Sequence, residues 1–155
     1  WIVAGGGAAL AVAADIRLAT ADIRFGMPIA RTLGNCLSLA NLNRLVNAFG
    51  ESRVRYMLLT AEFLPLSALM ESGFVSEVFD DADLCDERAR QLAKKIGQLA
   101  PRTIQASRDG LARLKQDAVL PDDSDLIELC YSSEDFQEGI NAFFDKRKAK
   151  WRGSS

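Results

Sequence analysis

Hydrophobic and polar positions along the chain follow two different periods, and the change from one to the other divides the sequence in two. Near the front, short apolar or alternating runs that end at glycine or proline predict β-strands, at 16–20, 23–26 and 74–79. Strong helix formers predict a helix at 8–14, and apolar residues at helical spacing predict one at 37–49. Further helices are predicted at 52–60, where Ser52 can cap the start, and at 67–72.

The second half of the pattern is helical throughout. It predicts four amphipathic helices, at 83–99, 101–115, 124–131 and 134–146. We therefore expect a small α/β region over residues 1–80 and a helical region over residues 81–155. The predicted strands are too few and too short to form a stable sheet alone. Since the chain also starts at Trp1 rather than Met, we expect a longer molecule or one paired with a partner.

The composition is that of an ordinary globular domain, and it narrows the classes of partner. The 155 residues are 48% hydrophobic and 26% charged, and 19 Lys+Arg against 21 Asp+Glu give a formal net charge of −2. This balance gives no electrostatic reason to expect nucleic acid as a partner. The longest apolar stretch, Gly5 to Ala14, has about half the length of a membrane-spanning helix, so we expect no membrane association.

Histidine and cysteine content limits the chemistry. The absence of histidine removes the commonest general base and the commonest metal ligand. The three cysteines, Cys36, Cys85 and Cys130, are odd in number and far apart, so neither a disulfide framework nor a metal site is indicated. We expect reduced thiols in a cytoplasmic protein.

A glycine triplet is the first candidate for a functional element. Gly5-Gly6-Gly7 runs directly into the predicted helix 8–14. The start of a helix presents free backbone N–H groups and the positive end of the helix dipole, which suits a developing negative charge. The alternative is that the helix start needs glycine only for its backbone angles.

Three separated segments together resemble the enoyl-CoA hydratase/isomerase (crotonase) family. The first is the glycine triplet with its helix and the run Asp15-Ile16-Arg17, followed by Phe25-Gly26-Met27-Pro28. The second comprises Leu33-Gly34, Arg44-Leu45-Val46 to Gly50, Leu58-Leu59-Thr60 and Gly73-Phe74-Val75. The third, over 134–147, is close to the family pattern E-D-x-x-E-G-x-x-A-F-x-x-K-R.

This resemblance implies a fold and an activity. The fold is an α/β, crotonase-like spiral of ββα units, of which this chain has only the rear part, followed by a helical C-terminal trimerisation region. The implied ligand is an acyl-CoA thioester, with coenzyme A as part of the substrate and no permanently bound cofactor. The implied assembly is a homo-trimer or a hexamer built as a dimer of trimers. Gly6 falls at the family's second oxyanion donor, with Gly5 and Gly7 beside it.

The chain departs from the family where hydratases carry their two catalytic glutamates. Those positions hold Ala9 and Ile29, and residues 30–32 contain no acid either. Some relatives use an aspartate slightly further on, but 35–38 also lacks a carboxylate. Paired carboxylates divide the work of activating water and moving the carbon-bound proton, so the hydratase pair is absent.

Four residues near this gap are candidates for replacement chemistry, each with a structural alternative. Cys36 is a candidate nucleophile or a small buried hydrophobe. Asn35 is a candidate to form a hydrogen bond with an acyl group or a water. The alternative is a loop residue that forms hydrogen bonds with nearby backbone groups. Arg31 pairs with a substrate anion or is solvated, and Ser38 is a weak further candidate.

Two residues of the third segment, Phe143 and Lys146, match family positions that reach coenzyme A bound to a neighbouring subunit. An aromatic ring for adenine and a cation for phosphate make physical sense. The alternative is an amphipathic C-terminal helix with Phe143 in the core and Lys146 solvated.

Three hypotheses about the whole chain follow from the sequence. It is an acyl-CoA enzyme with an altered site, a non-catalytic subunit for binding or assembly, or a fragment of a larger chain.

Overall fold

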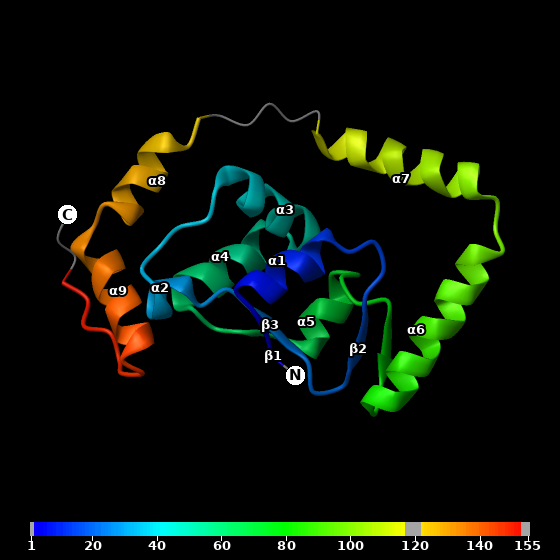
Figure 1. The fold of residues 1–155 in the computed structure, drawn as a ribbon, viewed down its shortest axis with the longest axis horizontal. Helices are drawn as coiled ribbons and strands as arrows, with labels where there is room; N and C mark the ends of the chain where they lie inside the picture. The colour runs from blue at the N-terminus through cyan, green and yellow to red at the C-terminus, as the bar shows by residue number, and fades with distance from the viewer. Residues whose placement is uncertain (1, 117–121, 153–155) are drawn as a thin grey trace.

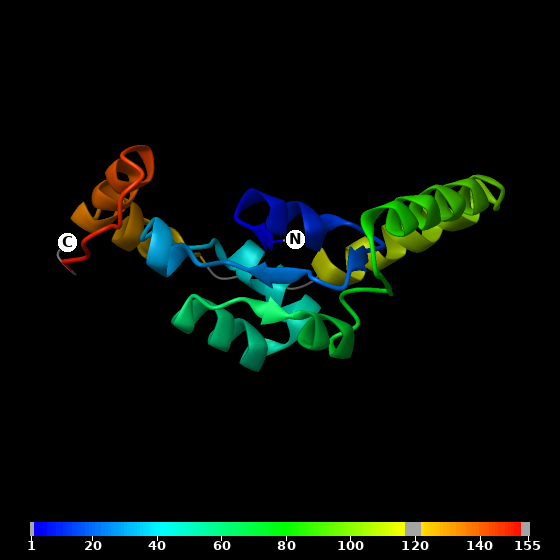
Figure 2. The same cartoon turned by 90° about the horizontal axis from the view of Figure 1, so that it is seen from below.

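The structure is a computed structural model, and it describes residues 2–116 and 122–152. Figure 1 shows a central body formed by the first half of the chain, with the helices of residues 82–116 at one end and those of residues 124–144 at the other. The turned view in Figure 2 confirms that the two helical pairs lie at opposite ends of the body.

Five very short strands form two separate sheets in the described part of the chain. Strand β1 (Ile2–Ala4) runs parallel to β3 (Arg24–Gly26), and β4 (Leu64–Pro65) pairs antiparallel with the other edge of β3. Strands β2 (Leu18–Thr20) and β5 (Glu77–Phe79) form a parallel pair. Strands this short are stable only because helices pack against them.

The helices of the body cover the strands on both sides. They are α1 (Gly6–Ala13), α2 (Ile29–Thr32), α3 (Leu39–Phe49), α4 (Glu51–Thr60) and α5 (Leu66–Glu71). Figure 2 shows α1 on one side of the three-stranded sheet and α4 and α5 on the other. Four more helices follow, α6 (Ala82–Gly97), α7 (Pro101–Gln116), α8 (Ser124–Tyr131) and α9 (Glu134–Phe144).

The centre of the body is a cluster of three phenylalanine rings. The Phe25 ring centroid lies 4.8 Å from that of Phe49 and 5.2 Å from that of Phe74, and the Phe49 and Phe74 centroids are 4.5 Å apart. Met57 and Leu69, which are fully buried, join the same cluster. These buried apolar side chains come from β3, α3, α4, α5 and the segment after α5, and their removal from water holds the body together.

Arg17 fastens the end of α1 to the core. Its guanidinium donates to the carbonyl oxygens of Ala11 and Ala14 at the end of α1, and its Nε donates to the Phe74 carbonyl at 2.5 Å. The guanidinium also lies 4.5 Å from the centroid of the Phe74 ring. Partial burial lowers the pKa of Arg17 from its usual value. The arginine of the Asp15-Ile16-Arg17 run therefore has a structural role.

The structure agrees with most of the predicted elements and adds three. Strands β1 and β4 and the short helix α2 were not predicted, and the strand expected at 74–79 is confined to Glu77–Phe79. The helix expected from residue 8 begins at Gly6, and α9 ends at Phe144, two residues before the predicted end. The boundary between regions 1–80 and 81–155 stays a prediction.

The long helices α6 and α7 leave apolar side chains in solvent. Leu84 on α6, Leu111 on α7 and Leu99 between the two helices are each more than half exposed. None of the helices at 2–116 and 122–152 combines the length and the hydropathy that a membrane-spanning helix needs.

Candidate functional site

The glycine triplet forms the turn from β1 into α1. Gly5 has φ +54° and ψ −126°, a backbone conformation that residues other than glycine rarely adopt. Its carbonyl accepts from the N–H groups of Ala8 and Ala9, at 3.1 and 3.3 Å. Helix geometry leaves the preceding N–H groups, on Gly6 and Gly7, without a partner inside α1.

The space beside the triplet is open. A Cβ added at Gly5, Gly6 or Gly7 would meet nothing within 4 Å among the described residues. Within the residues that the structure describes, no side chain caps the start of α1, and the first turn of α1 carries no acidic residue. The arrangement therefore presents helix-terminal N–H groups to a ligand that carries negative charge.

The two positions that match the family's glutamates lie on different helices. Ala9 is exposed on α1, one turn after Gly5, and Ile29 is the half-buried first residue of α2. Neither side chain can accept or donate a proton. Their assignment as the glutamate positions stays a prediction.

The loop between α2 and α3 is held by α8 through three polar contacts. Asn35 Nδ2 donates to the Tyr131 hydroxyl at 3.4 Å, and Cys36 Sγ donates to the Leu126 carbonyl at 3.3 Å. The Leu39 N–H donates to Asp123 Oδ2 at 2.6 Å. We call these contacts the α8 seam. They place the C-terminal helices of this chain against its own candidate site, and Figure 1 shows α2, α8 and α9 on the side where α1 begins.

Helix α9 lies just as close to the same loop. A Cβ on Gly139 would sit 2.4 Å from the Leu33 carbonyl oxygen, so only glycine permits this approach. Gly34 has φ +67°, and a Cβ added there would lie 3.2 Å from the Trp151 ring and 3.4 Å from the Asp135 carbonyl oxygen. The loop is therefore fixed in position by the end of the chain.

The three candidate side chains of the loop have different environments. Ser38 Oγ accepts from the Asn41 N–H at 3.4 Å and so caps α3. Burial, followed by contact with the Cys130 thiol, raises the pKa of the Cys36 thiol to about 11. The thiol is thus protonated near neutral pH and is a poor nucleophile. Within the described residues, Asn35 Oδ1 is buried without a hydrogen-bond partner. A catalytic role for any of the three stays a prediction.

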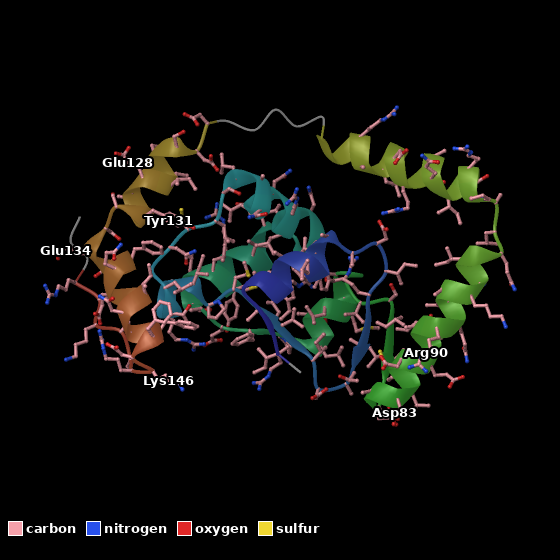
Figure 3. All side chains as sticks on the ribbon, in the orientation of Figure 1. Asp83, Arg90, Glu128, Tyr131, Glu134 and Lys146 are labelled. Atoms are coloured by element: carbon pink, nitrogen blue, oxygen red, sulfur yellow. The ribbon has the colours of Figure 1, made fainter. Side chains whose placement is uncertain are left out.

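Tyr131 is one of the residues at this site that sequence reasoning missed. Its ring packs on Phe136 with 4.7 Å between centroids, and its hydroxyl meets Asn35 from α8. Figure 3 labels it at the junction of α8 and α9. No local pattern could have found it, because Asn35 and Tyr131 lie in distant parts of the sequence.

Phe143 and Lys146 lie at the far end of α9. The Phe143 side chain is 69% exposed, and Lys146 is exposed with φ +52°. Figure 3 shows Lys146 at the edge of the molecule. Their predicted contact with coenzyme A of a neighbouring subunit stays a prediction, and their exposure is compatible with it.

A cavity of about 830 Å³ lies at the other end of α1. Its walls are the end of α1, the polar face of α3 and one face of α7. An ion pair between Asp15 and Arg108, 2.9 Å apart and with both side chains mostly exposed, bridges α7 to the body. This cavity does not include the glycine triplet, so it is separate from the candidate site.

Comparison with known proteins identifies the family. The family model for enoyl-CoA hydratase/isomerase matches residues 2–154. The chain belongs to the enoyl-CoA hydratase/isomerase family. It is 34% identical over 152 residues to the 2,3-dehydroadipyl-CoA hydratase of Escherichia coli, covering 96% of this chain and 59% of the relative. It is 30% identical to a short-chain-enoyl-CoA hydratase of Clostridioides difficile, covering 89% of this chain and 90% of that protein.

A solved structure confirms the crotonase-like fold. Methylmalonyl-CoA decarboxylase in complex with 2-nitronate-propionyl-CoA superposes with a TM-score of 0.87 at 25% identity. The match covers 98% of this chain and 60% of the decarboxylase. The chain therefore has part of the crotonase fold, as the resemblance implied, and it spans 59% of the length of the Escherichia coli relative.

Proposed function

We propose that the protein binds acyl-CoA thioesters and stabilises the enolate of the bound thioester through backbone N–H groups at the start of α1. The observation that carries this proposal is the uncapped helix start beside open space, at Gly5, Gly6 and Gly7. Gly6 is the proposed donor. Family membership supports the ligand class, since the names of the relatives describe CoA thioesters.

The physical argument concerns the charge on the thioester oxygen. When a proton or carboxylate leaves the adjacent carbon, negative charge moves to this oxygen. Preorganised N–H donors stabilise that charge more than the neutral carbonyl, which lowers the barrier. The aligned peptide dipoles of α1 add to this effect.

The reaction type depends on which group moves the proton. With Ala9 and Ile29 at the glutamate positions, we propose that the site relies mainly on enolate stabilisation, as an isomerase, hydrolase or decarboxylase would. Asn35, which has a buried acceptor oxygen, is the proposed polar contact to the acyl group or a water. Coenzyme A enters as part of the substrate.

A second candidate function is binding or assembly without catalysis. The missing carboxylates favour it directly, because a site without acids binds a thioester but transfers protons poorly.

We propose that the helices after residue 81 take part in assembly, as a homo-trimer or a dimer of trimers. The exposed leucines of α6 and α7 and the exposed Phe143 and Phe144 support this proposal. Sedimentation velocity measures the assembly directly, and a purely monomeric species at high concentration would overturn this part.

The test of the proposed function compares two substitutions of Gly6 by calorimetric titration with acetoacetyl-CoA. Gly6→Pro removes the proposed N–H donor at the first position of α1, where proline is well tolerated. Gly6→Ala keeps the donor, and its methyl group enters open space. We expect weaker binding and a weaker enolate absorbance band for Gly6→Pro only.

Equal binding and equal enolate absorbance for the two variants would overturn the oxyanion role. Far-ultraviolet circular dichroism verifies that both variants keep the fold. Turnover of a panel of acyl-CoA thioesters, assayed for isomerisation, thioester hydrolysis and decarboxylation, then separates the candidates. Binding with the enolate band but no turnover of any acyl-CoA favours the non-catalytic function.

A further inference from the structure

Two of the three cysteines meet in the α8 seam. Cys36 Sγ donates to the Leu126 carbonyl at 3.3 Å, which places the thiol against the turn of α8 that begins at Leu126. Cys130 is four residues further along the same helix. Since side chains on a helix tilt toward its N-terminus, the Cys130 thiol lies over that same turn. Each cysteine is half-buried and free.

The neighbouring contacts fix the relative position of the two backbones. Asn35, next to Cys36, binds the Tyr131 hydroxyl, and Tyr131 is next to Cys130. On the other side, the Leu39 N–H binds Asp123 at the start of α8. The loop and the helix are therefore held together on both sides of the cysteines.

We infer that Cys36 and Cys130 are a modification site, at which a small disulfide such as oxidised glutathione converts the two thiols into one intramolecular disulfide. The bond would fasten α8, and the α9 that follows it, to the loop that carries Asn35. This inference does not depend on the proposed acyl-CoA function.

The chemistry balances with the named oxidant. The thiolate of one cysteine attacks a sulfur of oxidised glutathione, forming a protein–glutathione disulfide and releasing one glutathione thiolate. The second cysteine then attacks the protein sulfur of that mixed disulfide and releases the second glutathione. Two protein thiols and one oxidised glutathione give one protein disulfide and two reduced glutathiones.

The environment of Cys36 sets the rate of this modification. Burial and the adjacent Cys130 thiol raise the pKa of Cys36 to about 11, so the thiolate fraction is small at neutral pH. Oxidation should therefore be slow at neutral pH and accelerate as the pH rises toward that value. This behaviour distinguishes a buried thiol pair from an exposed, activated cysteine.

The experiment incubates the folded chain with oxidised glutathione and measures intact mass before and after reduction. We expect the mass of two hydrogen atoms to be lost, and a proteolytic digest to contain one linked pair of peptides, with Cys36 and Cys130. The matched control is Cys85→Ser on α6, which should form the same bond. Cys36→Ser and Cys130→Ser should each lose it.

A second readout measures the structural consequence. Hydrogen exchange of α8 backbone amides should slow after oxidation in the unmodified chain and in Cys85→Ser, and return to its original rate on reduction. A bond that includes Cys85, a bond only between chains, or no bond in the folded protein when the denatured chain does oxidise would each overturn the inference.

Discussion

Gly139 of α9 lies against the carbonyl group of Leu33, so close that a Cβ on Gly139 would sit 2.4 Å from the Leu33 oxygen and 2.7 Å from its carbon. This contact joins the C-terminal helix to the loop that carries Asn35 and Cys36. The glycine in the third family-like segment therefore has a steric reason, since only glycine lets these two backbones meet.

Gly139→Ala is expected to destabilise the protein. Alanine has a higher helix propensity than glycine, but at this position its methyl group would clash with the backbone of Leu33. Overpacking of this kind typically costs about 1–3 kcal/mol in the free energy of unfolding. Urea denaturation of the full chain measures the change.

The matched control for this prediction is Gly110→Ala on α7, where an added Cβ meets nothing within 4 Å of the described residues. Helix propensity alone should then stabilise the chain, by about 0.5–1 kcal/mol. If both substitutions shift the urea midpoint in the same direction, the close approach of Gly139 to Leu33 has no energetic weight.

Asp123→Ala tests the α8 seam at the start of α3. Asp123 Oδ2 accepts from the Leu39 N–H at 2.6 Å, which satisfies one of the free donors of that helix end. Loss of such a contact costs about 0.5–2 kcal/mol of stability. Asp125→Ala, at an exposed residue of the same helix, should stay within about 0.5 kcal/mol. Equal losses for the two variants, measured by thermal unfolding, would contradict the prediction.

The helices could be predicted from sequence because their signals are local. The apolar spacing of α3 and the capping serine before it, Ser38, are visible without any tertiary information. Strands β1 and β4 could not be predicted in this way, because strands of two or three residues exist only through pairing with β3. Whether such a short segment forms a strand depends on its pairing partner, and the sequence of the segment alone does not identify that partner.

The same distinction between local signals and long-range contacts applies to the candidate site. A helix after the glycine triplet was predictable, since a glycine triplet before strong helix formers is a signal within one short segment, although the helix begins at Gly6 and not at residue 8. The contact of Asn35 with Tyr131 was not, because it depends on where α8 packs after a long intervening stretch of chain. The family resemblance supplied the residues of α1 and α2, while the partners on α8 came only from the packing of the helices.

Glu138 is expected to make stability depend on acidic pH. Its carboxylate accepts from Arg147 at 2.6 and 2.9 Å and from the Lys150 N–H at 2.9 Å. These bonds, above all those from Arg147, lower the pKa of Glu138 from 4.5 to about 2. As the pH falls through this window, the unfolded chain takes up the proton first, so the stabilisation is complete above it and is lost toward its lower end.

Glu138→Gln is the variant that isolates this contribution. The difference in urea midpoint between the unmodified chain and the variant should be constant near neutral pH and shrink as the pH falls from 4.5 to about 2. Glu128→Gln, at an exposed acid on α8, is the control for a general charge effect. A difference that stays constant to the lowest pH would show that Glu138 has its ordinary pKa in the folded chain.

Placing glutamate at both Ala9 and Ile29 tests whether these residues are the catalytic gap. Ala9 is exposed and Ile29 half-buried, so both positions leave room for a longer side chain to reach solvent. The unmodified protein should hydrate crotonyl-CoA very slowly, because no carboxylate activates water there. Two glutamates should raise the rate by about 10²-fold or more, the usual worth of general acid–base catalysis. Glutamine at both positions matches the size without the charge and should give no increase. Fast hydration by the unmodified chain, followed as loss of enoyl absorbance, would mean that another acid performs the proton transfer.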